Sequence, residues 1–347
     1  MRWWAFSISF DRLRRPPPEM GRLAALAAVV FWGLSFVATK QALLELTPLT
    51  LIFARFALGT LVLQIVLWLR REPLLPPRSE LPALALMGFI GVFLHQVLQV
   101  NGLNLTTAVR TGWLVGLIPI WSAILGAVFL GERLGGRKIL GLGMGMVGAA
   151  LVITRGEVFS RSLDLRATKG DLLVLASTFN WAVFSIIGRK TVKRLGSVRA
   201  TAAATFLGWT MTIPLFLSEH VGPAVFPSVS VRTLVAIAFL GVGCSGFAYL
   251  FWYVALERLP TSEVAAFLYL EPLVTLAAAV TLLQEPVAAT TIAGGVLAMV
   301  GVAIVQRAST GRGSSGARFR RERIAAGRTG RIQTPPDEDE RRGSRRT

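Results

Sequence analysis

The residues that could do chemistry lie almost entirely inside apolar stretches of the sequence. Glu271 occurs in FLYLEPL and is followed by Pro272, and His95 lies in GVFLHQVLQV beside Gln96 and Gln99. A carboxylate in such a setting is costly and is expected either to face a polar site or to pair with a basic residue. Pairing with Arg55 is one interpretation of Glu271 and a role in a binding site is the other, and the residues leave both open.

Polar and aromatic side chains also recur near the middle of other apolar stretches. Each of them could line a cavity, or could instead form interhelical hydrogen bonds and packing contacts. Arg55 could be the counter-charge of an anionic substrate, or an arginine that extends to the surface or pairs with a carboxylate. The predicted cavity residues are Trp32, Ser35, His95, Gln96, Gln99, Trp113, Asn180, Trp181, Tyr249, Trp252 and Glu271.

Other kinds of chemistry have little support in the sequence. The chain contains two histidines, His95 and His220, and one cysteine, Cys244. This supply argues against a thiolate metal site, a disulfide framework or a clustered catalytic centre. There is no phosphate-binding loop motif that would indicate direct drive by a nucleotide. We therefore predict no metal, no cofactor and no enzymatic activity.

The elements that must position these residues are membrane-spanning helices. Of 347 residues, 53% are hydrophobic and 16% are charged, against about 25% charged in soluble domains. The apolar residues form blocks near the roughly 20-residue length of a bilayer crossing, and an isolated span in lipid must be a helix. We predict ten spans, at 22–41, 48–69, 82–103, 110–131, 138–154, 171–188, 200–217, 233–255, 263–283 and 289–306.

The net charge of +18 is explained by membrane topology. With ten spans and a cytoplasmic N-terminus, 29 of the 37 Lys and Arg residues fall on the cytoplasmic side, five fall outside and three fall in or beside spans. This bias predicts a multi-pass inner (plasma) membrane protein with both termini in the cytoplasm. The partners expected are the lipid bilayer and a small molecule, with protons possible, and no nucleic acid; the oligomeric state stays open.

The two halves of the chain resemble each other at an offset of 153 residues. Pro119 corresponds to Pro272 and Glu132 to Glu285, and the next span repeats the Gly-x6-Gly spacing. Near the start of each half the offset is 149, which pairs Trp32 with Trp181. Five spans per half is an odd number, so the second half must enter the membrane inverted. Inverted repeats are typical of secondary transporters, which bind their substrate near the midplane.

The repeated residues themselves have simple structural interpretations. Glu132 and Glu285 each follow an apolar helix, and either carboxylate could face the positive end of the following helix; a gate or proton site is the alternative. Glycines at equivalent places in the fifth and tenth spans should let those helices pack closely, without substrate contact. These glycines are Gly141, Gly148, Gly294 and Gly301, together with Gly145.

Several motifs resemble an EamA-type permease of the drug/metabolite transporter superfamily. They are FWGLSFVATK, ARFALG, GLNLTTAVRTGWLVGLIPIWSAILGAVFLGERL and ALERLPTSEVAAFLYLEPLVTLAAAVTLLQEPV. The resemblance covers about 22–306 and implies ten helices in two inverted five-helix repeats that transport small metabolites. Many members of that family carry the same Glu-Pro pair as Glu271 and Pro272. QEPV departs from the family, which usually has Gly-Glu there.

These observations predict an all-α integral membrane protein with ten transmembrane helices arranged as two inverted five-helix repeats. The expected function is secondary or facilitative transport of a small organic metabolite by alternating access, with an amino-acid-like solute as one candidate and export favoured. A membrane-embedded enzyme or flippase acting on a lipid-linked substrate is the alternative. The predicted parts are a cytoplasmic segment 1–21, repeats 22–154 and 171–306, an external linker 155–170, and an arginine-rich, disordered cytoplasmic tail 307–347.

Overall fold

The computed structural model describes residues 18–131, 134–154, 164–219, 228–259 and 261–308. Glu132 and His220 lie outside the described residues. So do residues 1–17 of the predicted N-terminal segment, 155–163 of the predicted linker and 309–347 of the predicted tail. Within the described residues the secondary structure is helical and contains no strand.

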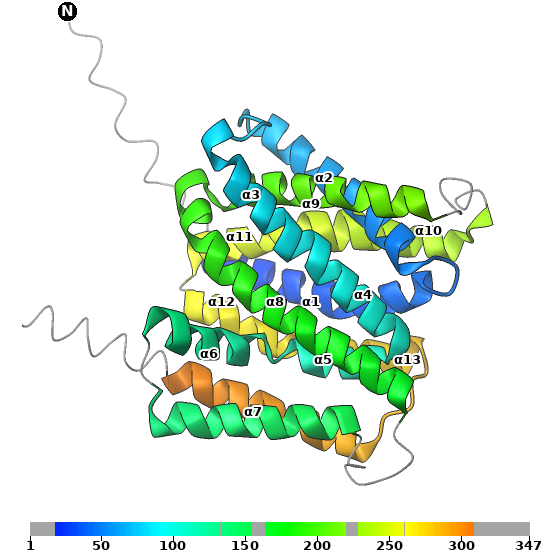
Figure 1. Ribbon diagram of the computed structural model, residues 1–347, viewed down its shortest axis with the longest axis vertical. Coiled ribbons are helices and arrows are strands. Elements are labelled where there is room, and N and C mark those ends of the chain that lie inside the picture. Colours follow the sequence, from blue (N-terminus) through cyan, green and yellow to red (C-terminus); the bar gives the residue numbers. More distant parts are fainter. Residues whose placement is uncertain (1–17, 132–133, 155–163, 220–227, 260, 309–347) are drawn as a thin grey trace, which may run out of the picture. The chain divides into compact units, whose positions relative to one another are not determined.

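The first half of the chain forms two continuous helices, two composite spans and a final continuous helix (Figure 1). The third span combines η1, α3, η2 and α4, and the fourth combines α5 and α6. In order, the elements are α1 (Pro18–Ala42), α2 (Pro48–Leu69), η1 (Arg78–Glu80), α3 (Leu81–Gly88), η2 (Phe89–Leu94), α4 (His95–Leu105), α5 (Ala108–Val115), α6 (Ile118–Leu130) and α7 (Gly136–Thr154).

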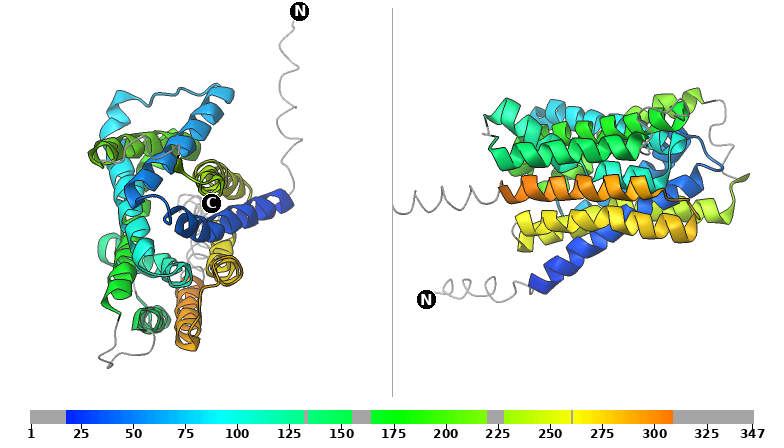
Figure 2. Two further views of the ribbon diagram at one scale, coloured as in Figure 1. Left: turned by 90° about the vertical axis from the view of Figure 1, so that its right-hand side faces the viewer. Right: turned by 90° about the horizontal axis from the view of Figure 1, so that it is seen from below.

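The second half repeats this pattern of continuous and composite helices. The elements are α8 (Leu165–Leu195), α9 (Ser197–Ser218), α10 (Val231–Ala238), η4 (Phe239–Phe247), α11 (Ala248–Arg258), α12 (Thr261–Phe267), η5 (Leu268–Leu270) and α13 (Glu271–Leu282). A last apolar helix follows at Ala289–Ala308. Figure 2 shows most helices running along a common direction, with the N-terminal part of α1, in blue, diverging from its neighbours.

Nine helices within the described residues are long and apolar enough to cross a membrane. The region of the predicted ninth span instead contains the shorter apolar helix Leu268–Leu282, preceded by α12. In this region the 3-10 turn η5 lies between α12 and α13. The number of ten spans therefore stays a prediction.

The irregular points of the helices occur in equivalent pairs. The π-helical segments η2 and η4 overlap under the 153-residue offset, and the breaks before Pro119 and Pro272 coincide under it. Both prolines lie in the first turn of the helix that follows, where the missing backbone N–H costs no helical hydrogen bond. π-helical segments are rare and frequently mark functional sites. The duplication thus preserved departures from regular helix as well as spans.

Equivalent helices of the two halves run antiparallel. A Cβ on Gly148 would lie 2.5 Å from the carbonyl oxygen of Gly294, and a Cβ on Gly141 would lie 2.6 Å from that of Gly301. The contacts therefore progress in opposite directions along α7 and the last helix, which lie side by side in Figure 1. Antiparallel equivalents are what inverted repeats require.

The repeats also interlock. Helix α1 packs against α11 and α13 of the second half, and its equivalent α8 packs against α4 and α6 of the first. In the same way α2 packs against η4, and α9 packs against η2. The first two spans of each half therefore enclose the irregular segments of the other half.

Candidate functional site

The π-helical segment η4 is surrounded by aromatic residues. The Trp32 Nε1 group donates to the carbonyl oxygen of Cys244 at 3.4 Å. The Trp32 ring lies 5.6 Å from the ring of Tyr249 and 5.3 Å from that of Trp252, between centroids. All three residues are half-buried. Trp32 therefore connects the first span to both the irregular and the regular part of the eighth.

Arg55 of α2 is buried beside this aromatic group. Its Nε donates to Ser245 Oγ at 3.0 Å, and its Nη1 donates to Gln96 Oε1 at 3.3 Å. The guanidinium also lies 5.3 Å from the centre of the Phe56 ring. Arg55 is 8% exposed and Gln96 is 6% exposed, so both side chains are held inside the protein.

The charge of Arg55 is not neutralised by an acidic side chain. Among the described residues no carboxylate forms an ion pair with it, and the pairing with Glu271 that the sequence left open is not made. A buried charge without an opposite charge costs several kcal/mol. The fold thus places one cation between neutral acceptors from the third and eighth spans.

His95, next to Gln96 in α4, contacts α8 of the second half. Its Nδ1 is 3.0 Å from the carbonyl oxygen of Ser177, so Nδ1 carries the hydrogen and donates it. The His95 ring lies 4.8 Å from that of Trp181, between centroids. The sequence predicted that His95, Gln96 and Gln99 line one cavity. In the structure His95 and Gln96 are buried, and Gln99, one helical turn further on, is half-buried.

Asn180 contacts the π-helical segment of the first half. Its Nδ2 donates to the carbonyl oxygen of Ile90 at 2.6 Å, in the same way that Trp32 donates to a carbonyl oxygen of η4. Ser35 is buried and donates to the carbonyl oxygen of Trp32 at 2.6 Å. Each irregular segment is therefore bound by a side chain from the first span of the opposite half.

Glu271 begins α13, immediately after the break in that span. Its carbonyl oxygen would lie 3.0 Å from a Cβ on Gly33, so the chain around Glu271 packs directly on α1 next to Trp32. Residue Glu271 as a whole is half-buried, and within the described part of the chain its carboxyl group forms no hydrogen bond or ion pair. Glu271 is thus an available intramembrane acid beside the aromatic group.

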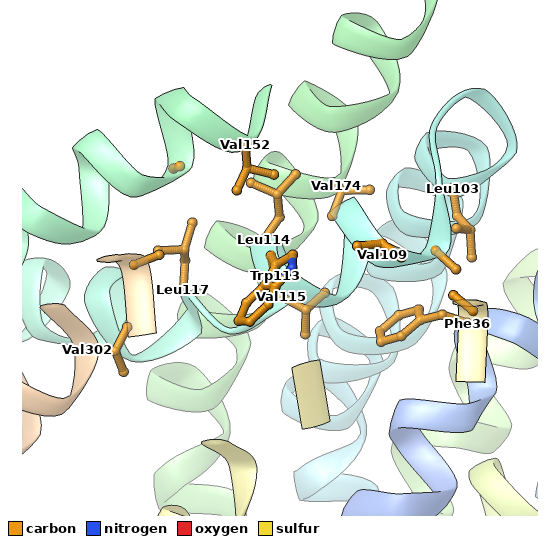
Figure 3. Packing of buried hydrophobic residues seen from close by; sticks show 14 of the residues in the cluster. Phe36, Leu103, Val109, Trp113, Leu114, Val115, Leu117, Val152, Val174 and Val302 are labelled. Carbon is orange, nitrogen blue, oxygen red and sulfur yellow. The ribbon is translucent and has the colours of Figure 1, made fainter. Parts of the chain in front are cut away.

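Trp113 is placed apart from these residues. It is 2% exposed and belongs to a hydrophobic cluster with Leu114, Val115 and Val302, which are labelled in Figure 3. A Cβ on Gly295 would lie 2.2 Å from the Trp113 ring, so the last helix packs flat against it. The structure therefore gives Trp113 a packing position in the core.

The expectation for Glu285 needs correction. Its carboxylate accepts from the backbone N–H groups of Ala108 at 2.9 Å and Val109 at 3.1 Å, and so caps the N-terminus of α5. We expected it to face the helix that follows it. The interlocked repeats instead bring the end of α13 to the start of its own equivalent span, where unpaired N–H groups attract a carboxylate.

Two ion pairs occupy equivalent positions with their charges exchanged. Arg110 of α5 pairs with Asp171 of α8, and Asp171 also accepts from Thr106 Oγ1 at 2.5 Å. The offsets of 153 and 149 residues relate Arg110 to Glu263 and Asp171 to Arg22. Arg22 Nε and Glu263 Oε1 are indeed 2.8 Å apart.

The equivalent ion pairs differ in burial. The side chains of Arg110 and Asp171 are 4% and 0% exposed, whereas those of Arg22 and Glu263 are 57% and 36% exposed. The buried pair lies at the same end as the Glu285 cap on α5. One end of the interlocked helices therefore carries buried polar contacts, and the ion pair equivalent to Arg110–Asp171 at the other end is solvated.

Ser245 and the four charged partners were not among the predicted site residues. The ion pairs had a signal in the sequence, because the repeat offset exchanges acid and base at both positions. Ser245 had none, since its equivalent is the apolar Val92. Within the described residues, no group of three or more His, Cys, Asp or Glu side chains could hold a metal ion.

The fold and these contacts define a multi-pass helical membrane protein built from two inverted, interlocked repeats. The model of the EamA-like transporter family matches the chain twice, over residues 19–154 and 168–307. The chain therefore belongs to the EamA-like transporter family, and its class of function is transport across a membrane.

Similar proteins carry names of the same class. An uncharacterized transporter of Archaeoglobus fulgidus is 32% identical over 81% of this chain and 94% of its own length. A "Probable terminal-alkyne amino-acid exporter" of Streptantibioticus cattleyicolor is 29% identical over 83% of this chain and 94% of its own. A "Probable amino-acid metabolite efflux pump" of Salmonella typhimurium is 27% identical over 81% and 92%.

The fold also occurs among solved structures. One crystal structure superposes with a TM-score of 0.60 over 82% of this chain and 96% of its own, at 20% sequence identity. At this identity the similarity concerns the fold alone.

Proposed function

We propose that this transporter exports a small amino-acid-like metabolite across the plasma membrane by alternating access, as a secondary or facilitative carrier. The observation that carries the proposal is the pair of equivalent ion pairs, one buried and one exposed. A carrier that opens to one side at a time needs equivalent contacts at its two ends, with those at one end closed while those at the other are open. The buried and the exposed ion pair fit this requirement.

The orientation of this state follows from the distribution of positive charge. With the N-terminus in the cytoplasm, Arg22 and Glu263 lie at the cytoplasmic end, and Arg110 and Asp171 lie at the external end. In this proposal the sealed end is external, and we infer an inward-facing state. The exchange of tight and loose closures would convert it to an outward-facing state.

The substrate site in this proposal is the group around the irregular segments. The first span contributes Trp32, the second Arg55 and the third Gln96. The eighth span contributes Tyr249 and Trp252. Irregular backbone inside a membrane is tolerated where protein or a water-filled space surrounds it, and such places are common transport sites. The names of similar proteins support an amino-acid-like solute.

Flux through purified protein tests this proposal. In proteoliposomes loaded with unlabelled L-phenylalanine, we expect saturable counterflow of labelled L-phenylalanine, with the solute recovered chemically unchanged. Empty liposomes and protein-containing liposomes loaded with sucrose are the controls. The absence of flux for L-phenylalanine and for a panel of neutral amino acids and their derivatives would contradict the proposal, and chemical conversion of the solute would indicate an enzyme.

A further inference from the structure

We propose that Arg55 binds the carboxylate of an amphipathic organic monoanion or zwitterion, whose apolar part packs against Trp32, Tyr249 and Trp252. This inference rests on the proposed function, because it assigns a substrate class to the same central site. It begins from a buried guanidinium that has neutral partners and no acidic one among the described residues.

The hydrogen bonds of Arg55 orient the guanidinium without neutralising it. Arginine has five N–H donors, and the described contacts use Nε and Nη1. Ser245 and Gln96 fix the plane of the group from two different spans, and Nη2 has no acceptor among the described residues. A planar cation held in this way is prepared for two parallel hydrogen bonds to a carboxylate.

A purely structural arginine would be arranged differently. An arginine that extends to the membrane surface has an exposed guanidinium, whereas Arg55 is 8% exposed and hydrogen-bonded inward. A structural ion pair has its partner in place, as Arg110 does with Asp171. The hydrogen bonds and the Phe56 ring offset part of the cost of burying Arg55, and an anion that joined it would offset more, which favours anion binding.

The surroundings of Arg55 select a particular class of anion. The Arg55 guanidinium is hydrogen-bonded to Ser245, which follows Cys244, the residue whose carbonyl oxygen accepts from Trp32. The Trp32 ring in turn contacts the rings of Tyr249 and Trp252. A single positive charge matches the single negative charge of a carboxylate, while a doubly charged phosphate would need further cations. The aromatic rings favour an apolar or aromatic remainder, which packs at offset or edge-to-face angles.

Binding of matched ligands tests the role of Arg55. The full-length protein in lipid nanodiscs is titrated with L-phenylalanine, with 3-phenylpropionate, which lacks the amine, and with L-phenylalaninamide, which lacks the carboxylate. Calorimetry measures each affinity. We expect at least one of the two carboxylates to bind ten times more tightly than the amide, because a charge-assisted pair of hydrogen bonds is lost in the amide.

Variants separate this role from a structural one. Arg55→Gln should weaken carboxylate binding at least tenfold and leave the amide affinity unchanged. Arg55→Lys, which keeps the charge but loses the planar donors, should fall in between. Arg70→Gln is the matched control, because Arg70 is an exposed arginine at the end of the same helix. If Arg55→Gln does not elute as folded protein, Ser245→Ala replaces it and should weaken carboxylate binding several-fold.

Three results would overturn the inference. The first is that the amide binds as tightly as the carboxylates. The second is that the carboxylate affinity is unchanged in both Arg55→Gln and Ser245→Ala. The third is that neither carboxylate binds to the wild-type protein. The proposed function has its own readout, which is flux. Flux of a solute without a carboxylate would support the proposed transport function and would contradict only the role proposed for Arg55. If the protein binds carboxylates but shows no flux of any solute, the role of Arg55 is supported and the proposed transport function is contradicted.

Discussion

At the scale of single residues, the two repeats treat their intramembrane charges differently. Arg55 is buried and hydrogen-bonded to neutral groups, whereas Glu271 is half-buried at the start of a helix and has no partner among the described residues. Neither residue has a charged equivalent in the other half, because Arg55 corresponds to Ala204 and Glu271 to Ile118. Charges that break the internal symmetry are better candidates for substrate chemistry than charges that follow it.

Glu271→Gln tests the role of this carboxylate. We expect at least a tenfold loss of L-phenylalanine counterflow with normal membrane insertion, because the amide retains the size of the side chain but can neither ionise nor exchange a proton. Counterflow in proteoliposomes measures the effect, and detergent size-exclusion chromatography checks folding. Glu72→Gln is the control, since Glu72 lies in the loop between α2 and η1. Undiminished flux in Glu271→Gln would remove Glu271 from the site.

At the scale of elements, irregular helices position the site and glycine contacts hold the outer helices. The π-helical segments η2 and η4 each accept a side-chain hydrogen bond from the opposite half, through Asn180 and Trp32. By contrast, α7 and the last helix are joined by backbone contacts at glycines and contribute none of the central hydrogen bonds described above. The fifth and tenth spans therefore brace the fold, as the sequence led us to expect.

Gly148→Ala tests this bracing. A Cβ there would lie 2.5 Å from both Gly294 O and Ala298 N, which are backbone atoms that cannot rotate away. We expect a loss of about 1–3 kcal/mol in the free energy of unfolding, as for other overpacked sites. Thermal unfolding in detergent measures it.

The matched control is Gly143→Ala on the same helix. A Cβ added at position 143 has nothing within 4 Å, so the apparent melting temperature of the Gly143→Ala variant should equal or exceed that of the wild-type protein. Equal melting temperatures for the two alanine variants would show that the contact at Gly148 does not limit stability.

At the scale of the whole transporter, the exchanged ion pairs predict opposite effects at the two ends. Asp171→Asn removes the charge of the buried carboxylate that pairs with Arg110, and breaking a buried ion pair typically costs 3–5 kcal/mol. We expect this variant to open the end that carries the buried pair. Glu263→Gln removes one partner of an exposed pair, a contact worth about 0–1 kcal/mol. It should change the conformational balance little.

Cysteine labelling in whole cells measures this balance. Gln99→Cys provides the reporter, and Asp171→Asn should increase its rate of labelling by an impermeant external maleimide several-fold. Glu263→Gln should leave that rate unchanged. The double exchange Arg110→Asp with Asp171→Arg should restore the slow rate. An unchanged labelling rate in Asp171→Asn would contradict the proposal that the Arg110–Asp171 ion pair closes the external end.

Much of this protein was determined by the sequence itself. The lengths of the apolar blocks, the offset of 153 residues and the odd number of spans per half predicted a helical membrane protein with inverted repeats. These features are local or periodic, and a bilayer permits few alternatives, so they can be read from the sequence alone. Polar and aromatic residues at equivalent positions also led to a predicted cavity that includes Trp32, Gln96, Tyr249 and Trp252, and their role in binding stays a prediction.

The tertiary structure decided which residues meet. Interlocking of the repeats placed Glu285 on the start of α5, Trp113 in the core beside Gly295, and Ser245 against Arg55. It also left Arg55 unpaired with Glu271 within the described residues. These contacts join spans far apart in the sequence, and their partners depend on how the helices cross. No local pattern encodes that crossing, because any face of an apolar helix is compatible with lipid.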